Sequence, residues 1–233
     1  MSERLAFIFG RALPLGVFGF LVAVQGELAL DGLQKATLGE LDRAAIMYLL
    51  NRFLTLFFFS FLLVIYVIRS KALAKDHNPA AIFFALIGSF VLYFLWLLPG
   101  QERSNNVWVL ACSDIFLGCG MVFALYSLSY LRHRFSIVPE ARGLVTTGPY
   151  RLVRHPIYLG EILAATGLIL PTALSLHLAV YLLFIYAQVR RTYYEERVLR
   201  SIYPEYDEYA ARTPRLIPFV MLTSLPASHA QTQ

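Results

Sequence analysis

The chain has 233 residues, of which 58% are hydrophobic and only 15% are charged, whereas a soluble domain carries about 45–50% apolar and about 25% charged residues. The hydrophobic residues stand in long blocks rather than at amphipathic spacing, which excludes one small soluble globule and predicts a single integral-membrane domain over residues 1–233. The formal net charge of +5 comes from basic residues near the ends of these blocks, where membrane orientation and contact with anionic lipids explain them, so no nucleic-acid partner is expected.

Residues 1–131 are predicted to form four transmembrane helices. A helix that rises about 1.5 Å per residue needs about 20 residues to cross about 30 Å of hydrocarbon. The first block is too long for a secretory signal peptide and lacks a small-residue cleavage site after it. The four blocks run over about 7–30, 46–68, 80–98 and 107–131. The predicted fold class is therefore all-α, a polytopic integral-membrane helical bundle.

Cys112 and Cys119 both lie inside the fourth apolar block, without the spacing of metal ligands. They are interpreted as packing residues, and no metal site is predicted.

A helical hairpin is predicted after the four spans. The apolar stretch 157–189 is too long for one ordinary crossing, and Pro171 disfavours helix just before it, so two shorter helices joined near Leu170-Pro171-Thr172 fit better. Basic residues follow the second and fourth blocks and the hairpin, which places these segments on the cytoplasmic side of an inner or cell membrane. The remaining two loops, 31–45 and 99–106, are poor in basic residues. Residues 132–223 are expected to hold the functional part, with a cytoplasmic helical tail, and 224–233 to be a flexible end.

The loop before the hairpin carries the first candidate motif. Gly148-Pro149 is typical of a turn, Pro156 suits the first position of a helix, and Gly160 lets another group approach the backbone closely. Arg154 and His155 are thereby delivered to a helix N-terminus, whose unpaired N–H groups and partial positive charge favour a carboxylate or phosphate. The alternative is a structural Arg-His pair that contacts lipid phosphate or a neighbouring carbonyl.

Glu195-Glu196 is the second candidate motif, on a helix that is expected to continue from the hairpin into the cytoplasm as far as Tyr203-Pro204. One interpretation is that the two acids only form surface pairs with Arg191 and Arg200, each worth about 0.2–0.5 kcal/mol. Their position close to the end of an apolar span favours a second interpretation, in which they hold a cation or sugar hydroxyls. The aromatic and charged segments that follow, 203–209 and 215–218, are expected to cover such a site.

These two motifs together resemble a known family. Arg154-His155-Pro156-x-Tyr158-x-Gly160, followed by Glu195-Glu196, Tyr203-Pro204-Glu205-Tyr206-x-x-Tyr209 and Ile217-Pro218, is similar to the isoprenylcysteine carboxyl methyltransferases and the related phospholipid methyltransferases. The resemblance starts at Gly143 and does not extend to the first three spans. It implies an integral-membrane enzyme with a cytoplasm-facing pocket for S-adenosyl-L-methionine and a lipid-like substrate that enters from the bilayer.

The resemblance also implies roles for individual residues. The expected reaction moves the sulfonium methyl group to an amphipathic acceptor of the isoprenylcysteine carboxylate or phospholipid amine type. A carboxylate acceptor needs no general base, whereas an amine needs one, and His155, Glu195 and Glu196 are all candidates for it. The implied cofactor contacts are Arg154, His155, Pro156, Tyr158, Gly160, Glu195 and Glu196. The implied catalytic residues are His155, Arg191, Glu195 and Glu196.

Two alternatives remain at this stage, and neither the methyl acceptor nor the oligomeric state follows from the sequence. Sterol-type membrane reductases share a related Arg-His loop but use NADPH, and Pro156 favours the methyltransferase. A transporter or scaffold would use the basic loops only for topology, and Glu27 and Asp114 are the main acids that could line its pathway.

Overall fold

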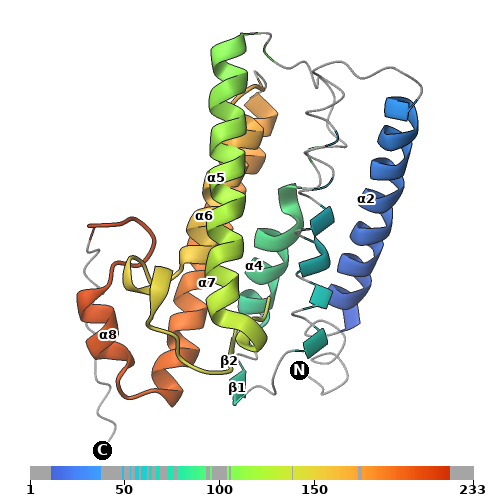
Figure 1. The fold of residues 1–233 in the computed structure, drawn as a ribbon. Helices are drawn as coiled ribbons and strands as arrows, with labels where there is room; N and C mark the ends of the chain where they lie inside the picture. The colour runs from blue at the N-terminus through green and yellow to red at the C-terminus, as the bar shows by residue number, and fades with distance from the viewer. Residues whose placement is uncertain are drawn as a thin grey trace, which may run out of the picture.

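In a computed structural model the chain is mostly helical, with long helices that run side by side (Figure 1). The structure describes residues 12–37, 73–75, 78–92, 106–137, 139–172 and 175–220, together with isolated positions between 49 and 68 and at 95 and 104. The elements in chain order are α2 (Leu13–Thr37), β1 (Ala74–Lys75), α4 (Pro79–Phe90), α5 (Val107–Leu131), the 3-10 helix η3 (Arg132–Arg134), β2 (Glu140–Ala141), the 3-10 helix η4 (Gly148–Arg151), α6 (Pro156–Ile169), α7 (Ser175–Ile202) and α8 (Tyr206–Arg212).

Two helices in the described part of the chain are long and apolar enough to cross a membrane, namely Leu13–Gln34 and Ala111–Leu131. Helices α4 and α6 are apolar but shorter. The predicted span at 46–68 falls almost entirely outside the described residues, and the span at 80–98 is described as α4 with a short 3-10 continuation, so the count of four spans stays a prediction. The two long apolar helices support the prediction that the chain is a membrane protein.

Helix α2 ends later than the sequence analysis predicts, because residues 31–37 are helical rather than part of a loop. The segment is polar, but it contains leucine, glutamine, lysine and alanine, which are good helix formers. Hydropathy marks where a helix enters water and does not mark where the helix ends.

Local sequence signals set the starts of three helices. Asn78 and Asn106 cap α4 and α5, and each side-chain oxygen accepts a hydrogen bond of 2.9 Å from the backbone N–H two residues later. Pro156 is the first residue of α6, which confirms the position expected for it. Pro171 lies in the turn between α6 and α7. The 28 residues of α7 extend about 42 Å, so α7 is longer than the hydrocarbon thickness of about 30 Å.

The antiparallel pair α5 and α6 is held together by small residues. A Cβ atom built on Gly120 would lie 2.3 Å from the backbone nitrogen of Ala164, and one on Gly160 would lie 2.7 Å from that of Ala124. Near the other end of the pair, the hydroxyl of Ser113 donates a hydrogen bond of 2.6 Å to the carbonyl oxygen of Gly167. Such close backbone contact is a common way for helices to associate in lipid, where the hydrophobic effect does not drive them together.

Contacts from α4 and β1 hold the segment after α5 in place. Ile82 and Ala85 of α4 pack with Leu128 of α5 and with Phe135 and Ile137 beyond it. The two-residue strands β1 and β2 pair antiparallel, with Ala74 opposite Ala141. The all-α prediction does not include this pair, which is too short to give an alternating sequence pattern. The described part of the segment after α5 is therefore held against the bundle through Phe135, Ile137 and Ala141.

The packing of α5 on α6 predicts that Gly120→Ala lowers stability. The new methyl group would overlap backbone atoms of α6, and such overpacking costs about 1–3 kcal/mol, or several degrees in the thermal unfolding midpoint. Gly118→Ala is the matched control, because a Cβ atom there meets nothing within 4 Å. Thermal unfolding of both variants in detergent tests this, and equal midpoints would show that the α5–α6 contact is looser than described.

Candidate active site

The loop before α6 and the tail after α7 are joined by hydrogen bonds. The backbone N–H groups of Arg154 and His155 donate to the carbonyl oxygens of Pro214 and Arg215, over 2.8 and 3.1 Å. The hydroxyl of Tyr209 on α8 donates to the carbonyl oxygen of Tyr150, over 2.6 Å. Residues from two distant parts of the sequence thus form one unit at the end of the bundle where α6 begins.

Glu196 is the side chain around which this unit assembles. It is fully buried, and Arg215 donates to both of its oxygens, over 2.9 and 2.8 Å. Arg154 Nε lies 3.2 Å and His155 Nε2 lies 3.3 Å from its Oε1 atom. Arg200, one turn further along α7, lies 3.3 Å from Oε2. One carboxylate therefore connects α7, the loop and the tail.

The charges of this cluster shift the pKa values of its members. Burial alone would raise the pKa of Glu196, but hydrogen bonds from His155 and Arg215 and the charges of His155 and Arg154 outweigh it and lower this pKa to about 2. Burial alone would lower the pKa of His155, but its contacts with Glu195 and Glu196 outweigh burial and raise it. Glu196 is therefore ionised, and His155 holds its proton to a higher pH than a free imidazole.

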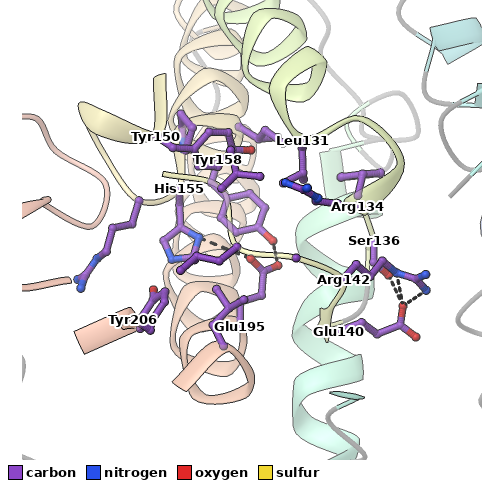
Figure 2. A pocket seen from close by; sticks show the side chains of 18 of the residues that line it. Leu131, Arg134, Ser136, Glu140, Arg142, Tyr150, His155, Tyr158, Glu195 and Tyr206 are labelled. Atoms are coloured by element: carbon purple, nitrogen blue, oxygen red, sulfur yellow. Dashed lines mark hydrogen bonds and ion pairs between the residues drawn. The ribbon is translucent and has the colours of Figure 1, made fainter. Parts of the chain in front are cut away.

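A pocket opens beside this cluster, between the segment after α5 and the start of α6 (Figure 2). Glu195 and Leu199 of α7 and Tyr206 and Tyr209 of α8 contribute further parts of its wall. The hydroxyl of Tyr206 is buried and has no hydrogen-bond partner among the described residues. The remaining lining residues are Leu131, Arg134, Phe135, Ser136, Glu140, Arg142, Gly143, Leu144, Val145, Tyr150, Arg154, His155, Pro156, Ile157 and Tyr158.

Three of the predicted residues meet directly in the pocket wall. The hydroxyl of Tyr158 donates a hydrogen bond to Glu195, and His155 Nδ1 lies 3.5 Å from the other oxygen of Glu195. The rings of His155 and Tyr158 are nearly parallel, with centroids 5.6 Å apart. The Glu195 side chain keeps 22% of its surface exposed, so this carboxylate remains accessible from the pocket.

Three other predicted residues lie behind the wall. Glu196 faces the arginines of the cluster rather than the pocket. The guanidinium of Arg191 lies 4.5 Å from the centroid of the Tyr158 ring and donates to Gln188 over 2.8 Å, so it supports Tyr158 from outside the pocket. The group that approaches Gly160 is helix α5 and not a ligand, because the Cα of Gly160 faces Gly120 and Ala124. Glu196 and Gly160, predicted as cofactor contacts, and Arg191, predicted as catalytic, are therefore not among the residues that line the pocket.

Sequence reasoning missed the pocket residues between the end of α5 and η4. Arg134 and Arg142 were assigned only to membrane orientation, since basic residues after a span have that role by default. Arg215 lies in the segment expected to cover the site, but its contact with Glu196 was not predicted. The one available signal was Gly143, a glycine directly after Arg142.

The comparison with known families identifies the part of the chain that builds this pocket. Residues 108–206 match the model of the phospholipid methyltransferase family. The match confirms the resemblance found in the sequence and supports a membrane methyltransferase. It includes all but the first residue of α5 and the whole of α6 and α7, and it ends at the first residue of α8, so Arg215 and the rest of the tail lie beyond it.

Three curated relatives are each similar to part of this chain. The cobalt-zinc-cadmium resistance protein CzcN of Cupriavidus metallidurans is 37% identical over 54% of this chain, and the nickel-cobalt-cadmium resistance protein NccN of Alcaligenes xylosoxydans is 31% identical over 54%. The chain covers 58% and 59% of the length of these two proteins. A delta(14)-sterol reductase of Mus musculus is 36% identical over 36% of this chain and 21% of its own length.

The Glu196 cluster predicts how stability depends on pH. The pKa of Glu196 lies below its unfolded value, so its contribution is complete above about pH 4.5 and disappears as the pH falls toward 2. The pKa of His155 lies above its unfolded value of 6.5, so its contribution is complete below about pH 6.5 and is lost as the pH rises through the folded value. The unfolding midpoint measured against pH should therefore be highest at mildly acidic pH.

Glu196→Gln should lower the midpoint by about 10 °C, because removing one partner of a buried ion pair costs about 3–5 kcal/mol, and the acid limb of the profile should flatten. Glu208→Gln is the control, since Glu208 pairs with Arg212 at the surface, where such pairs contribute little. An unchanged profile for Glu196→Gln would contradict the cluster.

Proposed function

We propose that this chain is an S-adenosyl-L-methionine-dependent integral-membrane methyltransferase that acts on a lipid-like or amphipathic acceptor, with its site on the cytoplasmic face. The observation that carries the proposal is the joining of His155, Tyr158 and Glu195 in one pocket wall, inside the segment that matches the phospholipid methyltransferase family.

The pocket fits the chemistry of this cofactor. The cofactor carries an ammonium group and ribose hydroxyls, and the accessible carboxylate of Glu195 can accept hydrogen bonds from either. It also carries an adenine ring, and the pocket offers the aromatic side chains of Tyr150, Tyr158, Tyr206 and Tyr209. When bound, the cofactor supplies a methyl group activated by a sulfonium.

The residues of the chain contribute mainly by position. Alignment of two reacting groups can contribute about 7–11 kcal/mol, and the buried loop and tail exclude water from one side of the pocket. An amine acceptor also needs a base, and Glu195 suits this role better than His155, because both ring nitrogens of His155 face carboxylates and these contacts raise its pKa. Glu196 and Arg191 act as positioning residues for His155 and Tyr158.

The membrane context supports an acceptor with an apolar part. The pocket lies where α5 ends and α6 begins, next to the apolar surfaces of both helices. Basic residues follow α5 and cluster at the C-terminal end of α7, and this distribution favours the cytoplasmic side for the pocket. A cytoplasmic opening would give the water-soluble cofactor access, while the acceptor would reach the pocket from the lipid.

The similarity to a sterol reductase supports one second candidate, an NADPH-dependent membrane reductase. The reductase is the weaker candidate because the similarity to the sterol reductase covers only 36% of this chain. Pro156 and the match to the phospholipid methyltransferase family both favour methyl transfer. The names of the two metal-resistance relatives state a resistance and not a reaction, so they do not separate the two candidates.

The detergent-purified protein should bind S-adenosylhomocysteine saturably and NADPH weakly or not at all. Calorimetric titration with each compound, in several lipid mixtures, measures this directly. Incubation with methyl-labelled cofactor and a membrane lipid extract, followed by mass spectrometry, should then reveal an acceptor that has gained one methyl group. Selective binding of NADPH would instead establish the reductase.

Glu195→Gln should raise the dissociation constant for S-adenosylhomocysteine about tenfold or more and lower the unfolding midpoint less than Glu196→Gln does. The reason is that a hydrogen bond involving a charged group contributes about 1.5–3 kcal/mol, while Glu195 is partly exposed and has no ion pair with the arginines around Glu196. Glu208→Gln again serves as the surface control. Unchanged affinity in Glu195→Gln would remove Glu195 from the site.

His155→Ala is a less specific test, because the buried contacts of His155 make a loss of stability expected as well.

A further inference from the structure

We propose that Arg134 binds an anionic group of the ligand, a carboxylate or a phosphate, on the side of the pocket opposite Glu195. The proposal deepens the proposed function and rests on it. Arg134 is the last residue of η3, directly after α5, and it lines the pocket. In Figure 2 its side chain lies across the pocket from His155 and Glu195.

The backbone at Gly143 leaves room for the Arg134 side chain. Gly143 has a φ of 139°, a conformation that other residues rarely adopt, and a Cβ atom there would lie 2.6 Å from Arg134 Nε and 2.8 Å from its Cδ. Any side chain at position 143 would therefore displace the guanidinium group. The conformation of residues 140–145 is thus coupled to the presence of an arginine at this wall.

The other arginines of the pocket wall already have carboxylate partners. Arg142 lies 2.5 Å from Glu140, and both side chains are almost completely buried. Arg154 is held by Glu196. None of the ion pairs found among the described residues involves Arg134. A guanidinium group that is partly removed from water favours an anion with two acceptor oxygens.

Opposite charges across one pocket favour a ligand that carries both signs. Glu195 offers a carboxylate on the α7 side, and Arg134 offers a guanidinium on the α5 side. Two sources of the anion have the same chemistry, the amino-acid end of the cofactor and an acidic head group of the methyl acceptor. Arg154 and His155, which the sequence analysis expects to hold this anion, are instead engaged by Glu196.

The experiment compares Arg134→Gln with wild type in two arms. In the first arm, S-adenosylhomocysteine, which has the carboxylate, is titrated beside 5′-methylthioadenosine, which lacks the amino-acid end. In the second arm, the shift in unfolding midpoint caused by dodecyl phosphate, a single-chain anionic amphiphile, is measured in maltoside detergent. Arg151→Gln is the matched control, because Arg151 is exposed and does not line the pocket.

If Arg134 binds the cofactor's anion, Arg134→Gln weakens S-adenosylhomocysteine binding about tenfold or more and leaves methylthioadenosine binding unchanged. If it binds the acceptor's anion, the variant keeps S-adenosylhomocysteine affinity but loses the stabilisation by dodecyl phosphate. Wild-type values in both arms would overturn the proposal.

Arg134→Lys keeps the positive charge but loses the two-pronged geometry, so it should give intermediate values, and it replaces the glutamine variant if that one does not fold. Failure of the wild-type protein to bind S-adenosylhomocysteine would count against the proposed function. Failure of Arg134→Gln to differ from a wild type that does bind would count only against the role of Arg134.

Discussion

The buried carboxylate of Glu196 is the interaction on which the candidate site depends. A carboxylate without partners in a dry interior is very unfavourable, and this one is stabilised because Arg215 and His155 hydrogen-bond to it and Arg154 lies within ion-pair distance. These cations belong to a loop and a tail that are far apart in the sequence. Arg154 and His155 also donate backbone hydrogen bonds to the tail, so side chains and backbone together hold the loop and the tail in one relative position. The pocket walls contributed by the loop and by α8 are therefore held by a contact that lies outside the pocket.

The second constraint is the close contact of α5 with α6. Because the two helices are antiparallel, the last turn of α5 and the first turn of α6 lie at the same end of the bundle, and the segments that leave them meet there (Figure 1). Gly120 and Gly160 bring the two backbones within reach of each other, and this contact sets how far η3 lies from His155. A wider spacing of these helices would separate Arg134 from the α6 side of the pocket. The small residues of the membrane helices thus determine the geometry of a site that lies beyond their ends.

The sequence predicted the parts of this arrangement that depend on local signals. Pro156 specified the start of α6, and the two motifs pointed to His155, Tyr158 and Glu195, which do meet in the pocket wall. The sequence could not show which of Glu195 and Glu196 faces the pocket. Neighbouring residues on a helix point about 100° apart, so only one of them was going to face the pocket, but choosing between them requires the position of the tail. Gly160 raised the same difficulty, because a glycine that permits close approach does not show whether a helix or a ligand approaches. The pocket arginines after α5 were not identified, because charges that orient a span and charges that bind a ligand look alike in a sequence.

His155 connects the cluster to the pocket, since its two ring nitrogens face different carboxylates. Nε2 lies 3.3 Å from Glu196 and Nδ1 lies 3.5 Å from Glu195, so a protonated ring can serve both at once. Arg215 in the tail hydrogen-bonds to the same Glu196 carboxylate that His155 contacts, so the tail affects the electrostatic interaction between Glu196 and His155. One imidazole therefore links the tail and the buried Glu196 cluster to Glu195 in the pocket wall, and this link follows from the order of Glu195 and Glu196 on α7.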